Sequence, residues 1–243
     1  MKTLILSAAL LAMTAGSAFA DAHGKMVRLG TEGAYAPYNF INDDGEIDGF
    51  ERELGDELCK RAELKCEWVK NDWDSIIPNL VSGNYDAIIA GMSITDERRK
   101  VIDFSEAYTQ PDPSVYVAAS DDVDMETAVI AAQSGTIQAS HVAGMEGATL
   151  LEFATPEETV AAVRNGEADA VLADKAFLAP IADADDDLMV AGEDVLLGGG
   201  IGMGIRKSDT ELRDTMSKAI ASMKEDGSLN ALIEKWLPES ATF

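Results

Sequence analysis

Two stretches of this sequence share one pattern, in which the end of a helix leads into a short strand. Residues 83–91 are GNYDAIIAG and residues 166–174 are GEADAVLAD. In each stretch a glycine ends the helix, Asp-Ala opens an aliphatic strand, and one distinct residue follows the strand, Gly91 or Asp174. A repeated helix–strand unit predicts two similar lobes, although such units also recur by chance in α/β proteins.

Strands and helices alternate along the rest of the chain, which predicts an α/β fold. Residues 27–31 are expected to form the first strand. Asp48 and Glu51 have the spacing of a capping box, and residues 155–158, TPEE, have the composition of a strong helix start. Apolar residues at helical spacing predict further helices, over residues 73–83, 208–223 and 229–236.

The segment after the first repeat has residues suited to binding a small carboxylate. Gly91 lets the backbone approach a ligand, and Ser93 offers a hydroxyl. Arg98 offers a planar fork of donors that matches a carboxylate. Ligands of open α/β sheets bind outside the carboxyl ends of the strands, where this segment is expected to lie. The alternative for Arg98 is a plain surface arginine, as we expect of Arg99 and Lys100 beside it.

If both strand ends face one cleft, Arg98 can hold a carboxylate while Asp174 holds an ammonium group, which are the two ends of an amino acid. The alternative for Asp174 is a helix cap. Residues 133–138, QSGTIQ, form a turn that enters a helix and supplies backbone N–H groups and a positive dipole for an anion. Taken alone, the same turn is an ordinary helix cap.

The two lobes are expected to be discontinuous in the chain. We predict that residues 21–110 and 200–243 form the first lobe and residues 111–199 the second. The chain would return to the first lobe through residues 197–200, LGGG. Two crossings make a hinge, and hinged closure around a ligand is a well-established conformational change.

The N-terminus has the order of a secretory signal. Lys2 is followed by an apolar run over residues 4–13 and by small residues that end at Ala20. The run is too short to span a membrane. Because Asp21 and not cysteine follows, we expect residues 1–20 to be removed near Ala20 and a soluble chain without a lipid anchor to work in the bacterial periplasm.

Cys59 and Cys66 are the two cysteines of the chain. In an exported protein, an even pair this close predicts one disulfide. Because His23 and His141 are far away in the sequence, we expect no metal site.

The formal net charge is −25, from 19 basic and 44 acidic residues. This charge argues against nucleic acid as a partner. A solvated acidic surface explains it, and an acidic docking surface is the alternative. With 47% hydrophobic residues, the chain can bury proper cores.

Several of these motifs, in this order, resemble the periplasmic solute-binding proteins of polar amino acid ABC transporters, the bacterial extracellular solute-binding protein family 3. The resemblance covers essentially all of the mature sequence. The cysteine pair is similar to that of the lysine/arginine/ornithine and histidine binders, and glutamine binders are also similar. The matching segments are residues 30–40 (GTEGAYAPYNF), 49–50 (GF), 72–80 (DWDSIIPNL), 90–105 (AGMSITDERRKVIDFS), 133–136 (QSGT), 166–174, 202–213 (GMGIRKSDTELR) and 226–236 (DGSLNALIEKW).

The resemblance implies a two-lobed periplasmic-binding-protein (Venus flytrap) fold, each lobe a sheet flanked by helices, with the ligand in the cleft. It implies that Arg98 holds the α-carboxylate of the ligand, helped by Ser93 and by the backbone N–H groups of Thr136 and Ile137. Asp174 would hold the α-ammonium group together with the Gly91 carbonyl and the Ser93 hydroxyl.

The same resemblance assigns the ligand side chain to three residues. Tyr35 and Trp73 would flank it, with plain core residues as the alternative. Glu32 lies where binders of basic amino acids have an acid, and an exposed acid is the alternative. The full set of candidate ligand-binding residues is Glu32, Tyr35, Trp73, Gly91, Met92, Ser93, Arg98, Thr136, Ile137, Gln138 and Asp174.

Three positions depart from the pattern of the basic-ligand relatives. Ala90-Gly91 stands where two serines are frequent, Ile137 replaces a frequent threonine, and Glu32 is longer than the expected aspartate. These departures leave the family assignment in place, but the identity of the ligand does not follow from the motifs.

The expected function is the ligand-binding component of an ABC importer for a polar, cationic amino acid. The chain would act as a monomer without catalytic residues or a cofactor, and its partners would be a membrane permease and ATPase subunits. The sequence has no GxxxxGK[ST] phosphate loop of its own. The alternatives are a dehydratase-like periplasmic enzyme with Glu32 or Glu193 as the acid/base, a signalling receptor domain, and a receptor for another small zwitterion.

Overall fold

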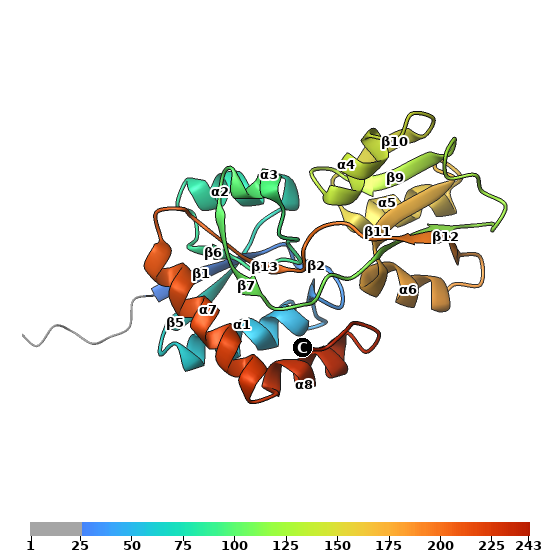
Figure 1. Cartoon of the computed structure of the whole chain (residues 1–243). Coiled ribbons are helices and arrows are strands. Elements are labelled where there is room, and N and C mark those ends of the chain that lie inside the picture. The colour runs from blue at the N-terminus through green and yellow to red at the C-terminus, as the bar shows by residue number, and fades with distance from the viewer. Residues whose placement is uncertain (1–25) are drawn as a thin grey trace, which may run out of the picture.

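Two β-sheets, each flanked by helices, form the two lobes of the computed structural model, which describes residues 26–243 (Figure 1). The α/β class and the two-lobed architecture are thereby confirmed. The predicted signal peptide lies outside the described residues.

The first sheet joins strands from both ends of the described chain. Its first three strands in sheet order pair in parallel, and the fourth, β13, pairs antiparallel with both of its neighbours. In sheet order, its strands are β5 (Lys65–Lys70), β1 (Met26–Thr31), β6 (Ala87–Ile88), β13 (Gly202–Ile205) and β7 (Asp103–Ala107). The helices of this lobe are α1 (Phe50–Arg61), the 3-10 helix η1 (Trp73–Ser75), α2 (Ile76–Val81), α3 (Asp96–Arg99), α7 (Thr210–Glu225) and α8 (Ser228–Trp236).

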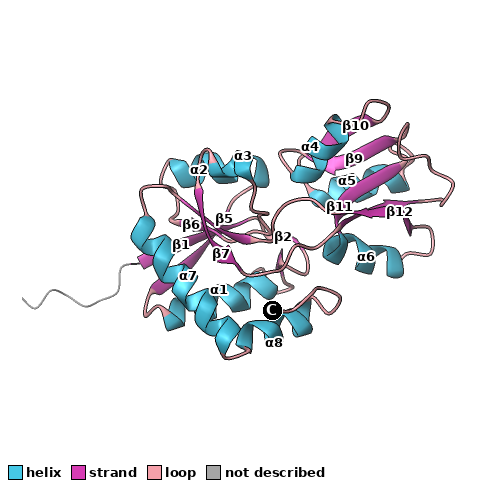
Figure 2. Cartoon of the chain, viewed as in Figure 1, coloured by secondary structure: helices cyan, strands magenta, loops and turns pink. Residues whose placement is uncertain are grey.

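A small antiparallel sheet extends the first lobe toward the second. It contains β2 (Ala34–Tyr35), β3 (Asn39–Ile41) and β4 (Ile47–Asp48). Figure 2 shows β2 close to the junction of the two lobes.

The second sheet has the same arrangement as the first. Its parallel strands are β10 (Thr149–Phe153), β9 (Val129–Gln133) and β11 (Ala170–Asp174), followed in sheet order by the antiparallel β8 (Ser114–Ala118) and β12 (Met189–Val195). Its helices are α4 (Ile137–Ala143), α5 (Pro156–Arg164) and α6 (Lys175–Asp183).

The two repeated stretches of the sequence occupy equivalent places. Strand β6 is the middle strand of the first sheet and β11 is the middle strand of the second. Each is parallel to one neighbour, β1 or β9, and antiparallel to the other, β13 or β8. Gly91 and Asp174 are therefore related by the repeat of the fold, as the sequence pattern predicts.

The chain passes between the sheets twice, from β7 to β8 and from β12 to β13. The two connections are hydrogen-bonded to each other, since the Tyr108 N–H donates to the Ile201 carbonyl (2.8 Å) and the Ile201 N–H donates to the Thr109 hydroxyl (3.1 Å). Both predicted lobe boundaries, at residues 110/111 and 199/200, fall in these connections. The boundaries themselves stay a prediction.

One predicted helix start is confirmed and another is wrong. Thr155 and Glu158 form a reciprocal capping box at α5, with Pro156 at its first position. Helix α1 follows Gly49 without any side-chain cap, and Glu51 is fully buried. Gly49 has φ of 116°, and a Cβ there would lie 2.7 Å from the Tyr38 carbonyl oxygen, so the backbone and not a polar side chain determines this helix start.

The predicted disulfide joins Cys59 in α1 to Cys66 in β5 and is confirmed. It closes a short loop at the connection between the two elements.

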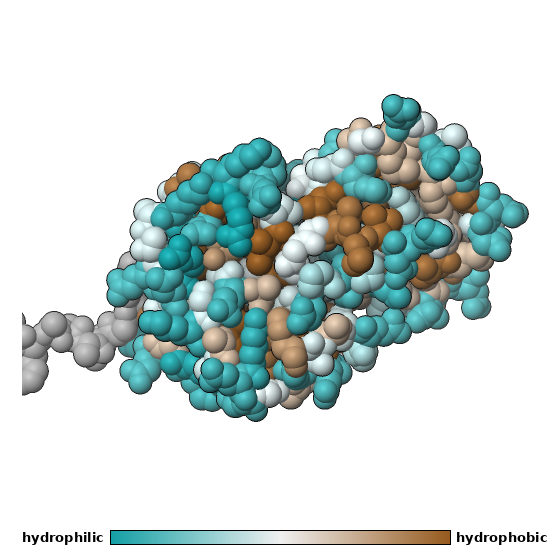
Figure 3. Space-filling view, in the orientation of Figure 1, coloured by the Kyte–Doolittle hydropathy of each residue, from teal (hydrophilic) through white to brown (hydrophobic). Residues whose placement is uncertain are grey.

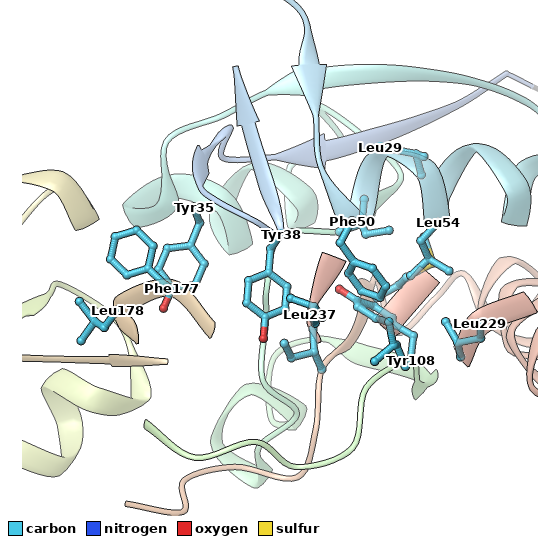
Figure 4. Packing of buried hydrophobic residues seen from close by; sticks show 14 of the residues in the cluster. Leu29, Tyr35, Tyr38, Phe50, Leu54, Tyr108, Phe177, Leu178, Leu229 and Leu237 are labelled. Atoms are coloured by element: carbon cyan, nitrogen blue, oxygen red, sulfur yellow. The ribbon is translucent and has the colours of Figure 1, made fainter. Parts of the chain in front are cut away.

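One hydrophobic cluster extends from the first lobe into the second (Figure 4). In the first lobe it contains Leu29, Phe50 and Leu54, all fully buried. At the junction, the ring of Tyr35 stacks on that of Phe177 in α6, with centroids 4.5 Å apart. This stacking brings β2 of the first lobe against α6 of the second.

Hydrophilic side chains cover much of both lobes in Figure 3, and hydrophobic ones gather near the junction of the lobes. Of the helices within residues 26–243, none combines the length and the hydrophobicity that a membrane crossing requires.

Candidate functional site

A pocket between the two lobes contains ten of the eleven candidate residues. It is partly open to solvent, and residues of both lobes line it. The first lobe contributes Glu32, Tyr35, Trp73, Gly91, Ser93 and Arg98, and the second contributes Thr136, Ile137, Gln138 and Asp174.

Met92 is the exception, because it is fully buried and packs in a core cluster of the first lobe with Ile76 and Leu80. The chain bends at Gly91, which has φ of 61°. Gly91 and Ser93 line the pocket, whereas the Met92 side chain between them packs into the core of the first lobe.

Asp174 ends β11 and is held by residues from both lobes. Its carboxylate accepts hydrogen bonds from the Tyr35 hydroxyl (2.9 Å) and from the Gln138 amide (2.9 Å). It stands at the start of α6, but its side chain makes no capping hydrogen bond. The carboxylate is therefore positioned for the pocket and not for capping the helix.

Burial raises the pKa of Asp174 to about 6, although the Tyr35 hydrogen bond and the Arg98 charge act in the opposite direction. A buried carboxylate of this kind is more stable in its ionised form when a cation approaches. Asp174 can therefore serve as the partner of a ligand ammonium group.

Arg98 lies on the opposite side of the pocket, in α3. Its guanidinium donates to the Ser93 carbonyl (2.8 Å) and, across the lobes, to the Gly135 carbonyl (3.4 Å). The guanidinium carbon lies 5.2 Å from the ring centroid of Trp73. Burial lowers the pKa of Arg98 to about 10, so the group remains a cation at neutral pH. These contacts orient a fork whose further N–H groups can bind a carboxylate.

The neighbouring Arg99 and Lys100 are exposed, as the sequence predicts for both. Arg99 forms an ion pair with Asp103 (3.3 Å), and Lys100 forms one with Glu97. Arg98 is thus distinguished from its neighbours by its position in the pocket and not by residue type.

Glu32 is buried, with 5% of its surface exposed, so it is not an exposed acid. Its carboxylate accepts a hydrogen bond of 2.6 Å from the amide of Gln133, which also donates to the Ala154 carbonyl (3.0 Å). Burial raises the pKa of Glu32 to about 7, against the effect of the Gln133 hydrogen bond. A second carboxylate, able to ionise near neutral pH, therefore lies in the same pocket as Asp174.

Gln133 lines this pocket but was not among the predicted site residues. It ends β9, a parallel strand of the second sheet, and the rule that placed Gly91 and Asp174 at the cleft applies to it as well.

The aromatic residues line the pocket and also belong to the core. Trp73 in η1 is 9% exposed and lies beneath Arg98, while Tyr35 stacks on Phe177. The two interpretations of these residues, as pocket wall and as core, are therefore compatible.

Thr136 caps α4, since its hydroxyl oxygen accepts from the Ala139 N–H (3.1 Å). Thr136 and Ile137 line the pocket at this helix start. Their role as backbone donors to a ligand stays a prediction.

Behind the pocket, Gly91 has φ of 61°, and its N–H donates a 2.6 Å hydrogen bond to the buried carboxylate of Glu51. No pattern in the sequence indicated this contact. Across residues 26–243, no group of three or more His, Cys, Asp or Glu residues is placed to hold a metal ion.

The pocket thus combines one cation with two carboxylates at the junction of two lobes. Such a charge arrangement suits a zwitterion that carries an additional positive charge, because each charged group of the ligand can meet an opposite charge.

Comparison with known proteins gives one family match. Residues 27–239 match the bacterial extracellular solute-binding proteins, family 3. The lysine/arginine/ornithine-binding periplasmic protein of Escherichia coli (strain K12) is 32% identical, over 97% of each chain.

Solved structures of amino acid-binding proteins are also similar to this chain. A periplasmic His/Glu/Gln/Arg/opine family-binding protein from Silicibacter pomeroyi, in complex with lysine, is 67% identical with a TM-score of 0.87, over 89% of this chain and 100% of that one. An ancestral amino acid-binding protein, a precursor of cyclohexadienyl dehydratase, is 30% identical with a TM-score of 0.79, over 87% of this chain and 95% of that one.

Proposed function

The chain belongs to the bacterial extracellular solute-binding proteins, family 3, and on this basis we propose that it binds a cationic amino acid and delivers it to the permease of an ABC importer. One observation carries the proposal. Arg98 and Asp174, from different lobes, line a single pocket together with the buried Glu32.

Each charged group of a cationic amino acid has a partner in this pocket. Arg98 binds the α-carboxylate, with Ser93 and the start of α4 as further donors. Asp174 binds the α-ammonium group, and the Gly91 carbonyl accepts from it. These contacts recognise the α-carboxylate and the α-ammonium group, which all amino acids share.

Other residues of the pocket recognise the ligand side chain. Its apolar stem lies between Tyr35 and Trp73, and its cation lies near Glu32. A cation over an aromatic face gains about 0.5–2 kcal/mol, depending on how far it is desolvated. The names of the relatives support this assignment, because one is a lysine/arginine/ornithine binder and another was solved with lysine.

Binding is coupled to closure of the lobes. A ligand that contacts Arg98 in one lobe and Asp174 in the other favours the closed form by its difference in affinity for the two forms. Hydrogen bonds between Tyr35 and Asp174, from Gln133 to Glu32 and from Arg98 to Gly135 already link the lobes around the pocket. The closed form then docks on the permease, and ATP is hydrolysed by other subunits.

The same proposal includes the place of action. Residues 1–20 direct export and are removed near Ala20, and the mature chain acts in the periplasm as a monomer. The periplasmic relatives support the compartment.

An enzyme on this fold is the competing function, and the dehydratase precursor among the similar structures makes it worth testing. Glu32 would be its acid/base group. Incubation of the protein with lysine or with a dehydratase substrate, followed by mass spectrometry, should recover the compound intact. Turnover would overturn the binding-protein assignment.

A thermal-shift screen tests the proposed ligand class. The screen covers the twenty common amino acids and ornithine, each with the same protein batch. Lysine, arginine or ornithine should raise the melting temperature most. Stabilisation by glutamate or aspartate alone would contradict a cationic ligand.

A further inference from the structure

Glu51 is a fully buried carboxylate in the first turn of α1. It accepts three hydrogen bonds, from the Asn39 amide (2.7 Å), the Gly91 N–H (2.6 Å) and the Tyr108 hydroxyl. All three donors are neutral groups. Burial raises the pKa of this carboxyl, with the three hydrogen bonds opposing the shift.

One of the three donors lines the pocket, one holds a turn beside it, and one begins a connection between the lobes. Gly91 lines the pocket itself. Asn39 in turn accepts a 2.7 Å hydrogen bond from the Gly33 N–H, between the pocket residues Glu32 and Tyr35. Tyr108 begins the first connection between the lobes and is bonded through its N–H to the second connection.

The direction of these hydrogen bonds requires an acceptor at position 51. Gly33 donates to the Asn39 oxygen, so Asn39 has only its amide N–H groups to offer to Glu51. The Gly91 N–H and the Tyr108 hydroxyl share the other carboxylate oxygen. An apolar residue would leave these buried donors without an acceptor, and unpaired buried donors are costly.

A buried carboxylate without a cationic partner is an expensive way to stabilise a fold. Here it is the common anchor of the pocket strand end at Gly91, the turn bonded to Asn39, and the inter-lobe connection at Tyr108. The geometry therefore indicates that Glu51 is needed to hold these segments in position, rather than to stabilise the fold.

We propose that Glu51 is a positioning residue for ligand binding, which sets the Gly91 strand end and the turn between Glu32 and Tyr35 at the distance the ligand requires. This inference rests on the proposed function, since it concerns the same pocket. Glu51 itself does not line the pocket and acts through Gly91 and Asn39.

Glu51→Gln tests this with nearly unchanged shape. The amide oxygen can still accept from Gly91 and Tyr108, but the amide nitrogen then faces the Asn39 nitrogen. Turning Asn39 over only moves the conflict to Gly33, whose N–H would then face a donor. One donor–donor contact therefore remains in every arrangement.

The double variant Asn39→Asp with Glu51→Gln should repair this contact. The carboxylate introduced at position 39 accepts from Gly33 with one oxygen and from the new amide with the other, while the amide oxygen keeps the Gly91 and Tyr108 bonds. Every hydrogen bond of the network is restored, and the negative charge moves from position 51 to position 39.

The readout is the dissociation constant for lysine, measured by calorimetric titration of the mature chain well below the melting temperature of each variant. Glu51→Gln should weaken binding about ten-fold or more. The double variant should return to within about three-fold of wild type, a difference of about 0.65 kcal/mol. A purely structural role would lower the melting temperature and leave the affinity of the folded protein unchanged.

Wild-type affinity in a folded Glu51→Gln variant would overturn the inference, and so would a folded double variant that stays as weak as the single one. If Glu51→Gln does not fold, Tyr108→Phe removes one of the three bonds, and unchanged affinity in that variant would also overturn it. Failure of the wild-type protein to bind any amino acid would instead overturn the proposed function.

Discussion

The Tyr35 hydroxyl donates a 2.9 Å hydrogen bond to the Asp174 carboxylate and accepts one of 3.1 Å from the Asp174 N–H. The two residues come from different lobes, so this pair links the lobes at the wall of the pocket. It also fixes the direction of the carboxylate that we assign to the ligand ammonium group. Tyr35, which is expected to flank the ligand side chain, thus also positions the carboxylate that we assign to the α-ammonium group of the ligand.

Tyr35→Phe removes both hydrogen bonds of this pair. It should weaken lysine binding at least about five-fold, the factor that corresponds to a single net hydrogen bond of about 1 kcal/mol. The phenyl ring keeps the stacking on Phe177 and the apolar wall. Calorimetric titration measures the change. Tyr85→Phe is the matched control, because it also removes a buried tyrosine hydroxyl, one that donates to the Ile76 carbonyl. Equal loss of affinity in both variants would contradict the role of the Tyr35–Asp174 pair.

Arg98→Ala should abolish amino acid binding, because no other cation lines this pocket in residues 26–243. Arg98→Lys should retain a small part of the affinity, since an ammonium group cannot form the bidentate fork. Arg99→Ala is the control, as Arg99 is exposed and pairs with Asp103. Equilibrium dialysis with labelled lysine measures all three, and near-normal binding by Arg98→Ala would refute the carboxylate clamp.

The stability of the ligand-free protein should fall between pH 4.5 and about 7 because of Glu32. Its pKa is raised from an ordinary value of 4.5 to about 7 by burial, so the folded state holds a proton that the unfolded state has released. This contribution is fully present below pH 4.5 and is lost as the pH rises through about 7. The loss amounts to roughly 3 kcal/mol at most.

Glu32→Gln isolates this effect from that of Asp174, whose raised pKa acts in the same direction. The amide keeps an oxygen that can accept from Gln133. Urea unfolding at several pH values should therefore show a smaller decline with pH in Glu32→Gln than in wild type. Identical pH profiles would exclude a raised Glu32 pKa in the folded protein.

Removal of the disulfide should lower stability and spare binding. In the chain-entropy model, a loop this short contributes roughly 2–3 kcal/mol. Cys59 and Cys66 join α1 to β5 and do not line the pocket. Urea unfolding of Cys59→Ser/Cys66→Ser should show that loss, and lysine titration should give a dissociation constant within about two-fold of wild type. A large loss of affinity would indicate that the pair also positions the cleft.

The lobes and most of the pocket could be predicted because they depend on local patterns. Alternating strands and helices indicate the class, and the repeated unit correctly relates β6 to β11. The rule that ligands meet the carboxyl ends of strands then brings Gly91 and Asp174 to one cleft. Gln133 follows the same rule and could have been included.

Glu51 could not be assigned in this way. Its spacing from Asp48 is that of a capping box, yet its partners Asn39, Gly91 and Tyr108 lie 12, 40 and 57 residues away. Such contacts exist only once the sheets and α1 have packed. The spacing of Asp48 and Glu51 describes only a local helix start. Which acceptor is available to Asn39, Gly91 and Tyr108 is determined by tertiary packing.

Met92 shows a different limit. It lies between two pocket residues in the sequence, yet its side chain is fully buried in the core of the first lobe. Ile76 and Leu80 of α2 form the core on its side. A place in the sequence beside pocket residues therefore does not by itself put a side chain in the pocket.

Lysine and two of its analogues test the site most directly in one calorimetric series on the mature protein. Cadaverine lacks the carboxylate assigned to Arg98, and 6-aminohexanoate lacks the α-ammonium group assigned to Asp174. Lysine should bind one-to-one, and each analogue should bind at least about a hundred-fold more weakly, because a buried charged partner is left unpaired. Cadaverine or 6-aminohexanoate binding as tightly as lysine would contradict the assignment of Arg98 and Asp174 to the two ends of an amino acid.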